Sequence, residues 1–473
     1  MSPLSTPTVT DQLSAFVVGT EYDDIPAEAI ELAQENILDA LGVALGGVSA
    51  AEGRQLKGWL AKQGGSPDAQ IIGMPLRTSA AQAALVNGIL THALDYDDGT
   101  HPMYGHPSCA ILPGVLAVSE RRRASGRDVL VAYSVGFEIA DRLGAVLNPA
   151  HHRAGWHGTS TIGALAASAA VGRALGIDAH RQAMAFGAAA SLAGGIKKNL
   201  GTMVKPLHAG HASWAGVISA EFAEMGWVSD DDVFAGPSGY FQVFRGADPI
   251  DPEAAVADLG QHWHIMDRPG GFHLKPFASC GGSHTTIQAM DRLRADPRVR
   301  LDEIAEVSIG INEMTVETLI RHDPRTGQEG KYSLEFCAAH TLVYGPPGIR
   351  DFTDEKVHDP EVRNVMNKVR ISSPAEVAHD PEHAAIATLI MRDGSEVQVF
   401  EPLGKGKHGN PMSRDDRIAK FRDCADGVLP IHQQDQVIAY VENLHRESDV
   451  SELMRLLQPS RPATSVHASP ARE

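Results

Sequence analysis

One stretch, residues 159–176 (TSTIGALAASAAVGRALG), limits the folds open to this chain more than any other. Its residues are small or apolar on every side of a helix. A helix that is apolar all round has to be buried among other elements, and small side chains let those neighbours come close. The stretch therefore predicts a central helix that other helices surround.

Further helices are predicted on both sides of this stretch, because apolar residues recur there at three- and four-residue spacing. No convincing alternating strand pattern occurs before residue 270. Residues 9–270 are therefore predicted to form the first part of a large, all-helical domain. The predicted helices cover about residues 26–47, 79–95, 108–123, 126–146, 159–175, 179–194 and 208–225.

The pattern changes after residue 270, where short segments alternate apolar with small or polar residues as half-buried strands do. Two of these segments flank Asp393-Gly394, which is typical of a β-hairpin with a type I′ turn. Residues 271–402 are therefore predicted to form a smaller α+β domain that covers the helical domain like a lid. The predicted strands cover 306–311, 368–371, 385–391 and 396–400, and the predicted helices 283–295 and 333–344.

Helical signals return beyond this domain. Ser413 and Asp416 form the pattern of a capping box, and another helix is predicted over about 431–444. We expect residues 403–458 to rejoin the helical domain, and residues 459–473, rich in Ser, Pro and Ala, to form a disordered tail. The predicted fold class is mainly α: a large, discontinuous all-helical domain plus a smaller α+β lid.

The charge of the chain argues against two classes of partner. Its lysines and arginines number 41 and its aspartates and glutamates 59, so the formal net charge is 41 − 59 = −18. A general binder of nucleic acid or of anionic membranes needs a basic face, so we expect neither partner. An anionic substrate would require positive charge concentrated locally.

The cysteines and the N-terminal sequence predict a soluble, cytoplasmic protein. The four cysteines lie far apart and form no Cys-x-x-Cys pair, as expected of reduced thiols in a cytosol. The sequence MSPLSTPTVTDQ lacks the basic and apolar regions of a signal peptide. No apolar run approaches the roughly 20 residues needed to span a bilayer.

Residues 92–107 (HALDYDDGTHPMYGHP) bring many titratable groups into one short segment. They begin where the apolar helix predicted over 79–95 runs out, and their glycines and prolines enforce a loop. A rigid helix that delivers acid–base groups into a loop can build a site. The alternative is that the aspartates cap helix ends and the histidines are solvated. The candidates are His92, Asp95, Asp97, Asp98, Thr100, His101 and His106.

Two lysines stand in similar local sequences. Lys205 and Lys275 each precede a proline amid apolar residues, which predicts partial burial and a need for an anionic partner. His157, just before the small-residue helix, is either a proton donor or a histidine that hydrogen-bonds into the core. His208 and His211 make a poor zinc signal without a third ligand. Together these groups could clamp a di- or tricarboxylate while a carboxylate or histidine moves a proton beside a carboxyl group.

Six separated motifs together resemble the MmgE/PrpD family, whose members include 2-methylcitrate dehydratase, cis-aconitate decarboxylase and iminodisuccinate epimerase. The resemblance runs in order over nearly the whole chain, from about residue 10 to residue 455. The motifs are His92-Ala-Leu-Asp-Tyr-Asp-Asp98, His106-Pro-Ser108, Gly155-Trp-His-Gly-Thr159, Lys205-Pro-Leu-His-Ala-Gly210, Lys275-Pro-Phe277 and Gly409-Asn-Pro-Met-Ser413.

The resemblance implies a homodimer, each subunit having a large helical domain and a smaller α+β lid. It also implies metal-free, cofactor-free acid–base chemistry on a di- or tricarboxylate in the cleft between the two domains. His106 would be the principal acid–base group and Asp95 would orient His106 or its loop. His157, a further catalytic candidate, would hold substrate carboxylates together with Lys205 and Lys275.

Two positions depart from the family pattern. The loop that contains Thr100 is one residue longer than in decarboxylase-like relatives, and Thr100 is retained as a substrate-binding candidate. Phe336 occupies the Ser-x-x-Tyr position at which the family has a lid tyrosine, and Tyr332 lies four residues earlier.

The predicted function is that of a metal-independent acid–base lyase, a dehydratase or decarboxylase, acting without a cofactor on a small di- or tricarboxylate such as 2-methylcitrate or cis-aconitate. The alternative is an epimerase or isomerase of an amino- or imino-dicarboxylate, which uses the same proton abstraction. A metallohydrolase using Asp95, Asp97, His101 and His106 is a different class, whose residue types suit a metal site. A carboxylate-binding paralogue without activity is another.

Overall fold

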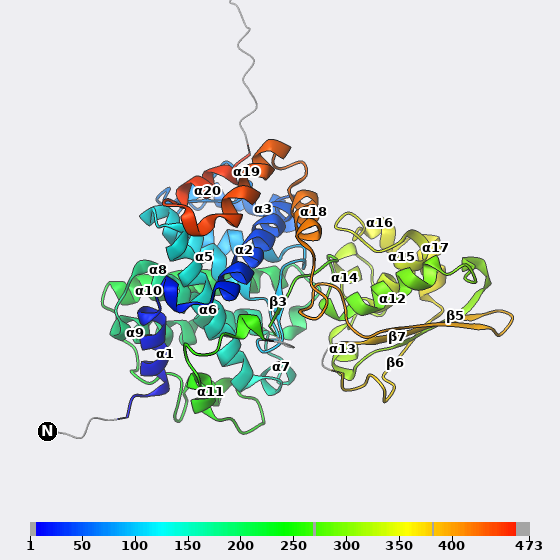
Figure 1. Ribbon diagram of the computed structural model, residues 1–473, viewed down its shortest axis with the longest axis horizontal. Helices are drawn as coiled ribbons and strands as arrows, with labels where there is room; N and C mark the ends of the chain where they lie inside the picture. The colour runs from blue at the N-terminus through cyan, green and yellow to red at the C-terminus, as the bar shows by residue number, and fades with distance from the viewer. Residues whose placement is uncertain (1–5, 268–270, 381–382, 460–473) are drawn as a thin grey trace, which may run out of the picture.

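The computed structural model describes residues 6–267, 271–380 and 383–459. A large helical unit and a smaller unit built on a β-sheet lie side by side (Figure 1). The buried core of the helical unit takes its residues from Val9–Leu274 and again from Met412–Leu457, whereas the core of the smaller unit takes them from Ile287–Val397. The predicted fold class, mainly α with a small α+β part, is confirmed.

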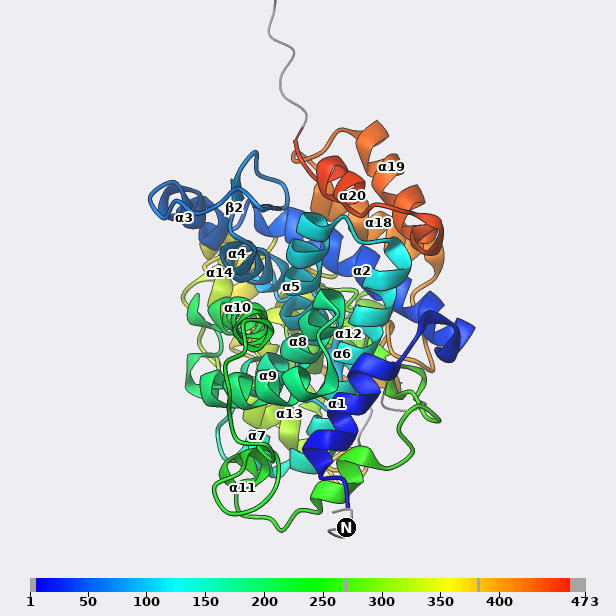
Figure 2. The same ribbon diagram turned by 90° about the vertical axis from the view of Figure 1, so that its left-hand side faces the viewer.

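Helix α8 (Gly158–Leu175) is the central helix that the small-residue stretch predicts. Figure 2 shows it in the middle of the helical unit, between α5, α6, α9 and α10. The small residues are needed there, because a Cβ added at Gly216 of α10 would lie 2.5 Å from the Cβ of Ala167. The helices of this part are α1 (Val9–Gly19), α2 (Ala27–Gly47), α3 (Ala51–Leu60), α4 (Ala80–His92), α5 (Pro107–Arg122), α6 (Gly126–Leu147), α7 (Ala150–Arg153), α9 (Ala179–Leu192), α10 (Val204–Glu224) and α11 (Tyr240–Phe244).

Two helix ends differ from the prediction, and both of them position site residues. Helix α10 begins at Val204 rather than near residue 208, because Pro206 lies in the first turn, where a helix does not need its N–H. Lys205 is therefore part of the helix and not of a loop. Helix α4 ends at His92, and Asp95 just beyond it adopts a left-handed conformation with φ of 52°.

The smaller unit, here called the lid, contains a four-stranded sheet in the order β6-β5-β7-β8. The predicted hairpin is confirmed, since β7 (Ala385–Met391) pairs antiparallel with β8 (Glu396–Glu401). Strand β5 (Ile304–Gly310) pairs parallel with β6 (Val369–Ser372). Helices α12 (His284–Ala295) and α15 (Leu334–Tyr344) lie on the same side of the sheet (Figure 1). Shorter helices complete the lid: α13 (Glu313–Thr318), α14 (Gly327–Gly330), α16 (Asp354–Val357) and α17 (Pro360–Met366).

Short strands occur where the sequence shows no alternation. Strands β1 (Ala69–Gln70) and β2 (Arg77–Thr78) pair with each other, and β3 (Gly99–Thr100) pairs with β4 (Phe272–His273). Strands of two residues are too short to leave an alternating pattern. The β3–β4 pair links the loop after α4 to the segment that leads into the lid.

The chain returns to the helical unit after the lid. Ser413 caps α18 (Arg414–Ala425) and forms the predicted capping box with Asp416. Helices α18 and α19 (Ile431–Glu442) pack against α2, and α20 (Ser451–Leu456) packs against α5. The tail predicted over residues 459–473 lies, from residue 460 onward, outside the described residues. Within the described part, the helices are too short or too polar to span a bilayer.

Candidate active site

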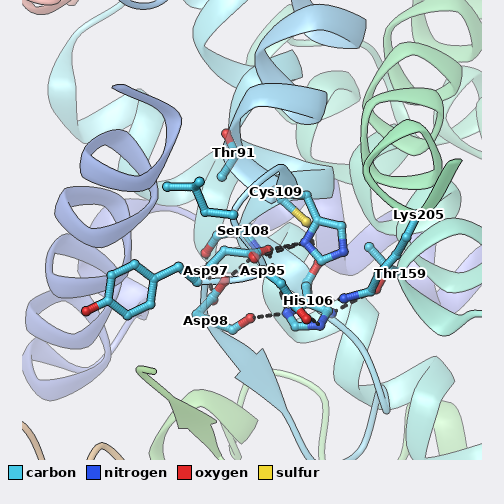
Figure 3. A network of polar contacts seen from close by, with 12 residues as sticks. Thr91, Asp95, Asp97, Asp98, His106, Ser108, Cys109, Thr159 and Lys205 are labelled. Carbon is cyan, nitrogen blue, oxygen red and sulfur yellow. Dashed lines mark hydrogen bonds and ion pairs between the residues drawn. The ribbon is translucent and has the colours of Figure 1, made fainter. Parts of the chain in front are cut away.

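The residues singled out in the sequence meet where the helical unit adjoins the lid. Asp95–Asp98 follow α4, His106 immediately precedes α5 and Lys205 lies in the first turn of α10 (Figure 3). His157 immediately precedes α8. Lys275 approaches from the segment that follows β4.

Asp95 is the centre of a buried ion cluster. Its Oδ1 accepts hydrogen bonds from Lys205 Nζ and Lys275 Nζ, each at 2.7 Å, and its backbone oxygen accepts a second one from Lys275 at 2.8 Å. Burial alone would raise the pKa of Asp95, but the two lysines together outweigh burial and hold that pKa well below its usual value. Asp95 is therefore ionised, and its single negative charge is shared by the two cations that were predicted to bind substrate.

The two lysines keep hydrogen-bonding capacity beyond Asp95. An ammonium group has three N–H donors. Asp95 accepts two from Lys275 and one from Lys205, so one donor of Lys275 and two of Lys205 are left over from these bonds.

His106 is held as a neutral ring with a defined tautomer. Its Nδ1 lies 2.7 Å from the backbone oxygen of Asp98, and because a carbonyl oxygen can only accept, Nδ1 carries the proton. Burial, aided by Lys275 and Lys205, lowers the pKa of His106 well below its usual value despite the opposing effect of Asp97. The Nε2 atom, 3.8 Å from Asp95 Oδ1, therefore has a free lone pair and can accept a proton.

His92, Asp97 and Asp98 make buried contacts that hold the loop of residues 95–106 in place. His92 Nδ1 lies 2.8 Å from Asp97 Oδ2, and both side chains are fully buried. Burial alone would raise the pKa of Asp97, but the nearby rings of His92 and His106 hold it below its usual value. Asp98 accepts a hydrogen bond from the hydroxyl of Ser108 at 2.7 Å. These contacts hold the loop in place beneath His106.

The hydroxyl of Thr100 is directed into the helical unit. Thr100 is 3% exposed, and its Oγ1 is hydrogen-bonded to Asp141 Oδ1 of α6 at 2.5 Å. Burial raises the pKa of Asp141 to about 8. Thr100 thus joins the loop to α6, although it also borders the cavity described next.

A cavity of about 880 Å³ opens between the helical unit and the lid. His106, Thr100 and Lys275 border it, whereas Asp95, His157 and Lys205 are not among its lining residues. The lining contains seven histidines and three lysines, and none of its described residues is an aspartate or glutamate. In a chain with a net charge of −18, the cavity concentrates basic groups at one place.

Comparison with known families accounts for most of the chain. The model of the MmgE/PrpD N-terminal domain matches residues 11–253, and that of the MmgE/PrpD C-terminal domain matches residues 277–446. The chain belongs to the MmgE/PrpD family. The C-terminal family model includes α18 and α19, which in this MmgE/PrpD protein pack on the helical unit.

The curated relatives of this MmgE/PrpD protein include cis-aconitate decarboxylases. The mouse (Mus musculus) enzyme is 27% identical over 464 residues, covering 95% of this chain and 93% of the relative. The human enzyme is 26% identical over 475 residues, covering 98% and 97%, and an Aspergillus terreus enzyme is 27% identical over 477 residues, covering 95% and 96%. Family and relatives together support a lyase.

Tyr332 is a site residue that the sequence left unassigned. It is 1% exposed, and the Lys205 Nζ lies 5.4 Å from the centre of its ring. Its hydroxyl has no hydrogen-bond partner among the described residues, although Asp95 is close enough to raise its pKa in addition to burial. Phe336, at the position of the family's lid tyrosine, instead packs in the lid core against Phe352. The sequence feature that could have pointed to Tyr332 is Lys331-Tyr332-Ser333, immediately before α15.

The residues that could hold a metal ion differ from those predicted. Ligand atoms of His92, Asp95, Asp97 and His106 lie within 4.8 Å of one another, whereas His101 is not part of the group. A divalent cation at Asp95 would face the ammonium groups of two lysines that already share one of its oxygens. The two ammonium groups therefore oppose a further cation at Asp95.

Proposed function

We propose that this protein is a decarboxylase or dehydratase of a small di- or tricarboxylate such as cis-aconitate or 2-methylcitrate, working without a metal or cofactor. The observation that carries the proposal is the cavity, lined by histidines and lysines and, among its described residues, by no carboxylate. The lysines of this lining attract an anion, and the histidines offer ring N–H groups that can hydrogen-bond it. Four of the candidate residues, Thr100, His101, His106 and Lys275, border that cavity.

The proposed chemistry assigns the proton transfer to His106. In a dehydration, the bare Nε2 of His106 would remove a proton from the carbon next to a carboxylate that Lys275 binds. The C–O bond would then break, and the leaving hydroxyl would take up the proton from His106 and depart as water. In a decarboxylation, the C–C bond to a carboxylate would break, the carboxylate would leave as CO₂, and the bonding electrons would stay on the remaining carbon, which then takes up a proton. Tyr332 has the free hydroxyl that such a donor needs.

The proposal is tested by incubating the protein with a panel of citrate, 2-methylcitrate, cis-aconitate and related acids in buffered D₂O. We expect NMR to show either a new product or exchange of a carbon-bound proton for deuterium in at least one acid. Folded protein that leaves every acid unchanged would contradict the proposal.

An epimerase of an amino- or imino-dicarboxylate is the second candidate. The neutral His106 with a bare Nε2 supports it equally, because epimerisation also begins with removal of a proton next to a carboxylate. The test is to incubate the protein with a single enantiomer and to analyse the products by chiral chromatography. Inversion of that enantiomer without loss of water or CO₂ would show an epimerase and not a lyase.

We also propose that two copies of the chain form a homodimer through the outer face of α10. Val204, Leu207, His211, Trp214 and Ile218 follow one another at alternating spacings of three and four residues, as in the seam between two packed helices. Val204 and Leu207 are 39% and 43% exposed, which is high for apolar residues of a helix in a core. A face of one helix can meet its own copy across a two-fold axis.

Light scattering tests the dimer. We expect a mass of twice the chain for the wild type and of one chain for Leu207→Glu. Val228→Glu, at an 82% exposed position beyond the end of α10, serves as the control and should leave the dimer intact. A monomeric wild type would contradict the proposal.

We propose that the protein acts in the cytoplasm on a soluble substrate, without nucleic-acid or membrane partners. The net charge of −18 and four unpaired cysteines support this location. Fractionation of cells that produce the protein, with antibody detection in the soluble and membrane fractions, tests it.

A further inference from the structure

His157 and His208 form a hydrogen-bonded pair that the proposed chemistry leaves unused. His157 immediately precedes α8 and His208 lies in the second turn of α10. Their Nδ1 atoms are 3.0 Å apart, and the ring centres are 5.2 Å apart. Since one nitrogen must donate and the other accept, a single proton lies between the two rings.

The surroundings of the two rings differ. His157 is enclosed, and burial followed by Lys205, His208, His92 and His106 lowers its pKa well below the usual value. His208 is less enclosed, and burial together with His92, Lys205 and His211 lowers its pKa to about 4. The charged or titratable groups that affect the pKa values of the two rings are His92 of α4, His106 before α5, and Lys205 and His211 of α10. Each of these groups is a base, so none of them stabilises a positive charge on the pair. An extra positive charge is therefore less unfavourable on His208.

We propose that His208 is a positioning residue that shares a proton with His157, so that a proton arriving at His157 Nε2 is passed on to His208 and His157 remains neutral. When His157 Nε2 takes a proton, its Nδ1–H bond breaks and a new N–H bond forms at Nδ1 of His208. The positive charge then rests on His208. The reverse transfer lets His157 return the proton.

The pair lessens the repulsion between a protonated His157 and the nearby lysines, although Lys205 also lowers the pKa of His208. A protonated His157 would face Lys205 across the cluster that also contains Lys275. Moving the charge to His208 places it on the ring with the smaller burial penalty. The catalytic part of this inference rests on the proposed function. The sharing of a proton between His157 and His208 does not depend on any substrate.

Two substitutions test the role of His208. His208→Asn keeps a side-chain amide that can hydrogen-bond His157 Nδ1 but cannot take up a second proton. We expect KM to stay within about twofold and kcat to fall about tenfold or more, with the acidic limb of the kcat profile moving to lower pH because His157 alone is harder to protonate. His208→Ala should also raise KM. His180→Asn, at an exposed position on α9, should change none of these.

A second measurement needs neither variant nor turnover. In ¹⁵N-histidine-labelled wild type, NMR should show scalar coupling between the two Nδ1 atoms across the shared proton. Absence of that coupling, or a His208→Asn enzyme with wild-type kcat and pH profile, would overturn the inference. Coupling in a protein that converts none of the acids would instead overturn the proposed function and leave the shared proton standing.

Discussion

Lys275, on the segment leading into the lid, donates two hydrogen bonds to Asp95 of the helical unit, one to the carboxylate at 2.7 Å and one to the backbone oxygen at 2.8 Å. Burial would lower the pKa of Lys275, but Asp95 and Asp97 raise it above its usual value. The lysine is thus charged before any substrate arrives. The site has its cations in place, and Asp95 keeps them from being buried charges without a partner.

Asp95→Asn should destabilise the protein strongly. Removing one partner of a buried ion pair costs about 3–5 kcal/mol, because the other charge is left uncompensated. We expect the free energy of unfolding, measured by urea denaturation, to fall by about this amount. Glu452→Gln, which removes an exposed partner of Arg455, is the control and should cost at most about 1 kcal/mol. Equal losses in the two variants would show that Asp95 does not hold the lysines together.

His106→Asn should separate catalysis from stability. The asparagine amide can still donate to the backbone oxygen of Asp98, while the Nε2 lone pair is lost. We expect the turnover rate to fall about 10²–10⁴-fold, the usual contribution of a positioned acid–base group, with the melting temperature close to wild type. Unchanged turnover by NMR would exclude His106 as the proton-transfer group.

Tyr332→Phe and Phe336→Tyr should have opposite kinds of effect. The first variant removes the free hydroxyl near Asp95 and should lower the turnover rate with little loss of stability, since that hydroxyl has no hydrogen-bond partner among the described residues. The second adds a hydroxyl to a fully buried ring and should cost about 1–3 kcal/mol through overpacking, without improving turnover. A faster Phe336→Tyr enzyme would move the tyrosine function to residue 336.

Asp141→Asn should change how stability depends on pH. The folded protein keeps the Asp141 proton up to a pKa of about 8, whereas the unfolded chain loses it above about pH 4. The contribution of Asp141 to stability is therefore full below pH 4 and is lost as the pH rises toward 8. Asparagine does not titrate, so the variant does not lose stability in this way. We therefore expect the free energy of unfolding of the variant to rise relative to that of the wild type between pH 5 and pH 8. A pH-independent difference in urea denaturation would contradict this.

The sequence predicts the parts of this molecule that depend on local pattern. The small residues of α8 and the Asp393-Gly394 turn locate a central helix and a hairpin because periodicity and turn chemistry act over a few residues. Local patterns do not show that Lys205 and Lys275 share one oxygen of Asp95. That contact depends on how the chain folds, since each lysine is more than a hundred residues from Asp95 in the sequence. Local patterns equally could not show which of Tyr332 and Phe336 faces the site.

The pairing of β3 with β4 has a mechanical consequence. Strand β3 belongs to the loop that ends at His106, and β4 leads into the lid two residues before Lys275. A Cβ at Gly99 would lie 2.7 Å from the ring of His273, so the two strands are in close contact. A lid that swings about this segment must either separate the strands or pull the catalytic loop with it. The position of His106 would then depend on the position of the lid.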